Sequence, residues 1–147
     1  MTRYRIPMYK LSMVRDGSVC ADRRVVCNAQ DLSPLLVEYF RGHDREEMLA
    51  VLLDAKHIIV GLHTVSIGSA TLSIVHPRET FKAAIVGQAS AIILAHNHPS
   101  GDPTPSQEDR DLTKRLREVG ELIGIPVLDH LVIGGARCHS FADHGEL

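Results

Sequence analysis

The segment of residues 95–109 constrains this chain most, because it leaves an apolar run, crosses a turn rich in proline and glycine, and enters a predicted helix. His96 and His98 are two positions apart, so on an extended segment their rings project from the same side and converge. Asp109 adds a third ligand from the start of the helix. Two imidazoles and one carboxylate leave a fourth position for water, a composition typical of catalytic rather than structural zinc sites. The segment therefore predicts a metal centre that acts on a bound water.

A purely structural interpretation of the same residues stays open. Ser106 and Asp109 have the spacing of a capping box, in which a serine caps a helix and an acid three residues later bonds back to the serine N–H. A carboxylate in the first helical turn points toward the preceding loop, so Asp109 can serve both purposes. An isolated His-x-His pair is also frequent on exposed strand ends. Spacing alone favours the helix cap for Ser106 and Asp109 and leaves the metal centre a hypothesis.

The order of these motifs resembles a known family. The string HNHP at residues 96–99, followed by Ser106 and Asp109, is similar to the JAMM motif of the JAB/MPN+ metalloproteases. Together with the flanking strings VHPRETFKAA and VLDHLVIGG, it resembles the bacterial RadC-like JAB domain over residues 45–141. The resemblance implies an α/β fold: a single-domain mixed β-sheet flanked by helices, in the JAB/MPN layer architecture that is also cytidine-deaminase-like.

The resemblance also implies a cofactor and a reaction. It implies one Zn²⁺ per chain, held by His96, His98 and Asp109, with a bound water whose pKa falls toward neutrality. The implied function is a zinc-dependent metallopeptidase that hydrolyses a peptide or isopeptide bond. Its substrate is then a peptide or protein whose identity the sequence does not give. Two alternatives remain: a DNA-repair-associated protein that binds or cleaves nucleic acid, or a non-catalytic MPN interaction module.

Two further catalytic roles follow from the resemblance. JAMM families place a glutamate, outside the ligand set, at the start of a buried strand, and counting back from Asp54 puts Glu46 at that position as general base. Glu47 is the fallback. Ser106 then donates to the developing oxyanion beside the metal. Within the string VLDHLVIGG, Asp129 and His130 are interpreted as a structural pair.

Hydrophobic patterning predicts the elements that carry this site. Two strands around Asp16-Gly17 are expected to form a hairpin over residues 4–14 and 18–27. Asp31 is expected to cap a helix that ends before Gly42. Further strands are predicted at residues 48–53, 58–60 and 91–95, and further helices after Pro77 and after Ser106. Residues 127–128 and 131–133, with Gly134-Gly135, predict a final strand and turn. Residues 65–71 resemble the family's Gly-Thr turn. Residues 1–44, a hairpin and a helix, are expected to pack on a core of residues 45–147 as one domain.

Composition limits the partners and the compartment. The formal charge of −2 gives no general attraction to phosphate backbones, so nucleic-acid binding is open but not indicated. The three cysteines include no C-x-x-C pair, which suits a reducing cytoplasm. The first residues lack the apolar region of a secretory signal, and no apolar run is long enough to span a bilayer. We expect a cytoplasmic protein without a membrane partner, and the oligomeric state stays open.

Overall fold

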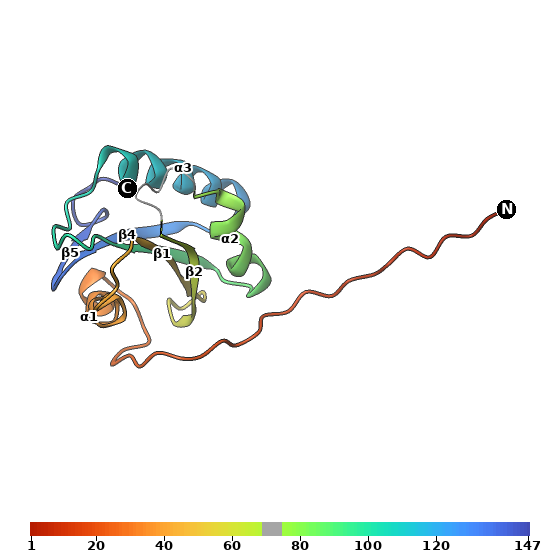
Figure 1. Ribbon diagram of the computed structural model, residues 1–147, viewed down its shortest axis with the longest axis horizontal. Coiled ribbons are helices and arrows are strands. Elements are labelled where there is room, and N and C mark those ends of the chain that lie inside the picture. Colours follow the sequence, from red (N-terminus) through yellow and green to blue (C-terminus); the bar gives the residue numbers. More distant parts are fainter. Residues whose placement is uncertain (69–74) are drawn as a thin grey trace.

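A five-stranded mixed sheet forms the centre of the protein in the computed structural model, which describes residues 1–68 and 75–147 (Figure 1). The elements in chain order are α1 (Ala29–Phe40), β1 (Glu47–Leu53), β2 (Ile59–Ile67), α2 (Pro77–Val86), β3 (Ala91–Asn97), α3 (Gln107–Ile123), β4 (Val127–Gly134) and β5 (Arg137–Ser140). The strand order is β2-β1-β3-β4-β5, with β3 and β4 parallel and the other neighbours antiparallel. The predicted α/β class, with a mixed sheet flanked by helices, is confirmed.

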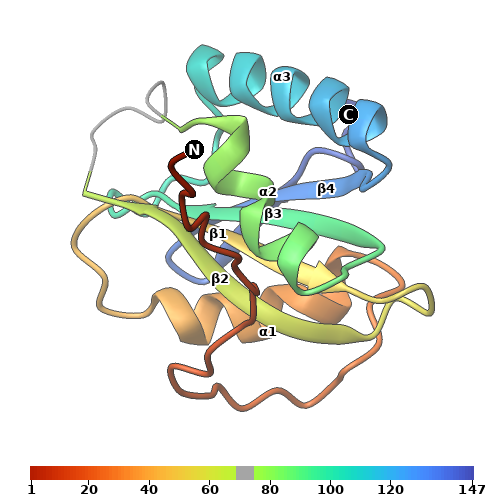
Figure 2. The same ribbon diagram turned by 90° about the vertical axis from the view of Figure 1, so that its right-hand side faces the viewer.

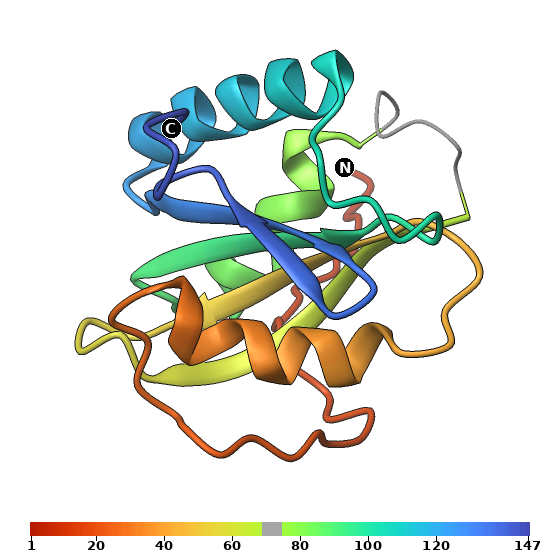
Figure 3. The ribbon, with the colours of Figure 1, turned by 90° about the vertical axis from the view of Figure 1, so that its left-hand side faces the viewer.

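The two central strands, β1 and β3, are buried along their whole length. Alternate side chains of a strand point to opposite faces of the sheet. Leu49 and Ile93 accordingly pack in the core beneath α1, whereas Ala50 and Leu94 pack in the core beneath α2 and α3. Figures 2 and 3 show α1 on one side of the sheet and the other two helices on the opposite side. The continuous apolar runs are therefore explained by burial on both faces.

Helix α1 begins earlier than predicted. Its N-cap is Asn28, whose side-chain oxygen accepts a hydrogen bond of 3.1 Å from the N–H of Asp31. Asp31, the predicted cap, instead accepts a bond of 2.9 Å from the N–H of Cys27 and pairs with Arg23. Asn28 has the extended conformation of an N-cap, with φ −155° and ψ 174°, whereas Asp31 lies within the first turn of the helix.

The predicted N-terminal hairpin is wrong. Residues 4–14 form no strand, and in residues 18–27 the pairing is limited to a single bridge between Val25 and Ile58. The segment extends away from the sheet (Figure 1), and side chains such as Tyr4 and Ile6 are more than four-fifths exposed. A two-stranded hairpin is marginal in water without an apolar face to pack against, so turn chemistry at Asp16-Gly17 is not sufficient to form one.

Two other differences concern the strands. Strand β2 continues well beyond the predicted residues 58–60, whereas the strand predicted from residues 127–128 and 131–133 is present as β4. The chain then reverses into β5, which was not predicted. Residues 69–71 of the predicted Gly-Thr turn lie outside the described residues.

Among the described helices, none combines the length and the apolar character needed to cross a membrane.

Candidate metal centre

Three predicted ligands converge where β3 ends and α3 begins. His96 is the sixth residue of β3, His98 follows the strand directly, and Asp109 lies in the first turn of α3. The Nε2 atoms of His96 and His98 are 3.0 Å apart. One Asp109 oxygen lies 3.3 Å from Nε2 of His96, and the other lies 3.3 Å from Nε2 of His98. The potential ligand groups of three residues therefore face one point in space.

This spacing fits a tetrahedral zinc ion. Ligand atoms at about 2.0–2.1 Å from a tetrahedral zinc stand roughly 3.3–3.4 Å from one another. The planes of the two imidazole rings are inclined by 64°, so in-plane lone pairs of His96 and His98 can meet at one ion. Two imidazoles and a carboxylate are also a donor set suited to zinc among the divalent metals. The residues present fit the metal that the sequence suggested.

Burial and hydrogen bonding shift the pKa values of His96, His98 and Asp109 in different directions. Burial lowers the pKa of His96, which has no exposed surface. The hydrogen bond to Asp109 raises the pKa of His98, which is partly open to solvent. Although burial opposes ionisation of Asp109, hydrogen bonds from the two histidines hold its pKa far below the usual range. The cluster therefore holds an ionised carboxylate against two imidazoles.

Ser106 and Asp109 form the predicted capping box. The Ser106 hydroxyl accepts a bond of 3.1 Å from the N–H of Asp109, and one Asp109 oxygen accepts a bond of 2.8 Å from the N–H of Ser106. The capping and ligand geometries are compatible because a carboxylate has two oxygens with several lone pairs. The hydroxyl hydrogen of Ser106 is not used in the box, so Ser106 can still donate a bond.

The two neighbouring glutamates point to opposite faces of the sheet. Glu47 is buried on the α1 side, where its carboxylate accepts bonds from Tyr39 at 2.5 Å and Thr64 at 3.1 Å. Glu46 precedes it by one residue and is half-buried near the histidine cluster. Burial raises the pKa of Glu46, while the charge of His98 lowers it and that of Asp109 raises it. Glu46 is therefore an acid whose charge interacts with the cluster, whereas the Glu47 carboxylate bonds to Tyr39 and Thr64.

Asn97, for which the spacing of the histidines predicts no role, holds the backbone on both sides of Glu46. Its side-chain oxygen accepts a bond of 2.8 Å from the N–H of Glu47, and its amide nitrogen donates a bond of 2.9 Å to the carbonyl of Arg45. The signal available in the sequence was its place between the two histidines. One short segment, residues 96–98, therefore supplies two potential ligands and anchors the strand that carries Glu46.

The loop that carries His98 is held against the end of β4. The His98 N–H donates to the carbonyl of Ile133 at 2.7 Å, and its Nδ1 donates to the carbonyl of Asp102 at 2.8 Å. That second bond leaves Nε2 without a hydrogen in the neutral ring, so Nε2 is the nitrogen available to a metal. The main chain at residues 101–103 passes so close to Gly134 that a Cβ there would lie 2.5 Å from the nitrogen of Pro103.

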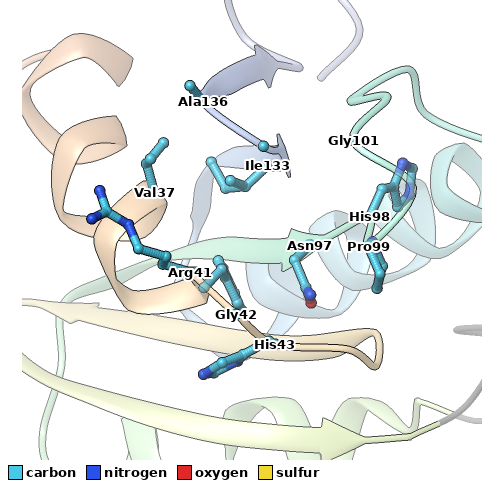
Figure 4. Close-up of a pocket in the computed structure, with 12 residues that line it drawn as sticks. Val37, Arg41, Gly42, His43, Asn97, His98, Pro99, Gly101, Ile133 and Ala136 are labelled. Atoms are coloured by element: carbon cyan, nitrogen blue, oxygen red, sulfur yellow. The ribbon is translucent and has the colours of Figure 1, made fainter.

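A cavity of about 280 Å³ opens beside His98 on the α1 side of the sheet. Figure 4 shows Val37 and Ile133 on one side of it and Asn97, His98 and Pro99 on the other. The cavity thus lies between the end of α1, the loop after β3 and the β4–β5 turn. A molecule bound in it would touch His98.

A second group of potential ligands, His139, His144 and Glu146, does not have the geometry of a metal site. The rings of His139 and His144 are stacked, with centroids 3.9 Å apart and planes only 16° from parallel. Their in-plane lone pairs cannot meet at one ion, since nearly parallel planes do not intersect within bonding distance. Glu146 is also neutralised by an ion pair with Arg110.

Fold and site together define a class of protein. A single α/β domain with a mixed five-stranded sheet between one helix and two helices has the JAB/MPN fold. The model of the RadC-like JAB domain matches residues 26–146, and the chain belongs to this family. The JAB superfamily includes metallohydrolases.

Bacterial relatives support the same assignment. The chain is 52% identical over 120 residues to a UPF0758 protein of Caldanaerobacter subterraneus subsp. tengcongensis, covering 82% of this chain and 52% of the relative. It is 51% identical over 132 residues to a UPF0758 protein of Desulforamulus reducens, covering 89% of this chain and 58% of the relative. The chain therefore spans about half the length of these relatives.

Proposed function

We propose that this protein is a zinc-dependent metallopeptidase that hydrolyses a peptide or isopeptide bond, with one zinc ion held by His96, His98 and Asp109. The observation that supports this proposal is the convergence of two imidazole nitrogens, 3.0 Å apart, on a carboxylate whose two oxygens each lie 3.3 Å from one of them, beside a second, half-buried carboxylate. Three protein ligands leave a fourth position open, which is what a hydrolytic zinc site requires. A zinc ion bound there supplies a Lewis acid that activates water and polarises a carbonyl oxygen.

The surrounding residues have separate tasks in this proposal. Glu46 accepts the proton of the attacking water at its carboxylate and later returns it to the leaving amine. The Ser106 hydroxyl donates a hydrogen bond to the oxyanion that develops on the substrate carbonyl. Asn97 keeps Glu46 in place through the flanking backbone. The cavity beside His98 supplies room for a part of the substrate on the α1 side of the sheet.

A matched pair of variants tests the general base. Glu46→Gln removes the base without touching a ligand, so we expect stoichiometric zinc and a loss of peptide hydrolysis of roughly 10²–10⁴-fold. Glu47→Gln changes a carboxylate that bonds to Tyr39 and Thr64 on the opposite face, so we expect hydrolysis to persist and the free energy of unfolding to fall by about 1–2 kcal/mol. The measurements are zinc content, cleavage of a peptide library and urea denaturation.

The same experiment separates the other interpretations. Absence of zinc from the purified wild-type protein after incubation with Zn²⁺ would refute the proposal. An active Glu46→Gln together with an inactive Glu47→Gln would assign the base to Glu47. A non-catalytic module binds zinc but cleaves nothing in the library. A nucleic-acid function predicts DNA affinity that falls steeply with salt, and such binding without peptide cleavage would favour that alternative.

A further inference from the structure

His130 lies in β4, buried beside the predicted ligand His96. Its ring has no exposed surface and stacks on Phe141, with centroids 4.9 Å apart and planes 13° from parallel. The Asp129 carboxylate accepts a bond of 2.7 Å from the backbone N–H of His130 but none from its ring. Its other donors are the hydroxyl of Ser140 and the N–H of Ala142. The two residues are therefore not a side-chain pair, and both ring nitrogens of His130 find other partners.

These partners link two of the predicted ligands, His96 and Asp109, through a chain of hydrogen bonds. Nε2 of His130 lies 2.7 Å from Nδ1 of His96, and its Nδ1 lies 2.5 Å from the hydroxyl oxygen of Thr113. The Thr113 hydroxyl in turn lies 2.6 Å from the main-chain carbonyl of Asp109, one turn back along α3. This hydrogen-bond relay thus runs from the backbone carbonyl of Asp109, through the side chains of Thr113 and His130, to the ring of His96.

The partners determine where each proton lies. The Asp109 carbonyl can only accept, so Thr113 must donate its one hydrogen to it. Thr113 then accepts from Nδ1–H of His130, and the neutral His130 ring presents a lone pair at Nε2. His96 must therefore donate from Nδ1–H, and its own lone pair lies at Nε2, the atom that faces Asp109 and His98.

We propose that His130 is a positioning residue which, oriented by Thr113, holds His96 in the Nδ1–H tautomer and so presents its Nε2 to the metal. This inference rests on the proposed metal centre. The opposite tautomer of His96 carries a hydrogen at Nε2 and cannot bind a metal there. Partners of this kind orient ligand rings in metal sites, and their loss typically weakens metal binding roughly 10–100-fold.

The tautomers can be observed without any metal or substrate. Long-range ¹H–¹⁵N correlation spectra of the ¹⁵N-labelled protein distinguish protonated from unprotonated ring nitrogens. We expect His96 and His130 both to be protonated at Nδ1 and unprotonated at Nε2. A hydrogen on Nε2 of either ring would overturn the relay, even if the protein binds zinc.

Variants of Thr113 test the relay at a distance from the ligands. Thr113→Val keeps the shape of the side chain but removes the hydroxyl, so Nδ1–H of His130 loses its acceptor. We expect the dissociation constant for Zn²⁺, measured by competition with a chelator, to rise roughly tenfold. Thr113→Ser keeps the hydroxyl, and we expect affinity near that of the wild type. Equal affinity of the valine and serine variants, both shown to be folded by circular dichroism, would refute the relay.

Variants of His130 identify the nitrogen that matters. Gln places an oxygen near the position of Nε2 and can accept from His96, whereas Asn reaches only the position of Nδ1. We expect His130→Gln to retain most of the zinc affinity and His130→Asn to lose it roughly 10–100-fold. The reverse order would contradict the proposal. Wild-type protein that binds no zinc would refute the proposed function, while the tautomer spectra would still decide the relay.

Discussion

Replacing Asn97 by alanine tests how the anchor of Glu46 contributes to stability and to chemistry. Asn97 is 4% exposed, and its side-chain oxygen is the acceptor for the N–H of Glu47, which is itself buried. Removing this acceptor leaves a buried donor unpaired, at a cost of about 1–3 kcal/mol. The bond to the carbonyl of Arg45 contributes less, because it is only partly buried. We therefore expect the free energy of unfolding to fall by about 1–3 kcal/mol.

The same change should slow hydrolysis while leaving zinc bound. Without Asn97 the backbone beside Glu46 is no longer held, and loss of alignment of a catalytic group by about 1 Å can cost roughly 10²-fold in rate. The matched control is Asn28→Ala, which removes the N-cap of α1 and costs about 0.5–2 kcal/mol far from the cluster. Urea denaturation and turnover at equal zinc occupancy are measured for both variants. Equal turnover in the two variants, or a stability loss below about 0.5 kcal/mol for Asn97→Ala, would refute this reasoning.

Two glycine substitutions are expected to have separate effects. Gly134→Ala forces the main chain at residues 101–103 outward, and the carbonyl of Asp102 in that segment holds the His98 ring. We therefore expect weaker zinc binding in a competition with a chelator. Unchanged affinity would show that the loop does not position this ring. Gly120→Ala places a Cβ 2.6 Å from the carbonyl of Ile125, so thermal or urea denaturation should show a loss of about 1–3 kcal/mol with zinc affinity unchanged. A stable Gly120→Ala protein would mean that the end of α3 adjusts easily.

The elements that depend on local patterns could be predicted from the sequence. The continuous apolar runs gave the central strands, and the serine and aspartate three residues apart gave the start of α3 with its capping box. The hairpin around Asp16-Gly17 failed under the same reasoning, because turn chemistry does not supply the apolar face on which a hairpin must pack.

By itself, the sequence determined the segment in which two histidines and an aspartate come together, because their spacing along a strand, a loop and a helix turn is a local property. Tertiary structure decided what surrounds them. The register that pairs Met48 with His96 puts Glu46 on the face of the cluster and Glu47 on the other. Asn97 contacts Glu47, 50 positions away in the chain, and His130 contacts His96, 34 positions away. Such contacts follow from strand order and register, which no short stretch of sequence specifies.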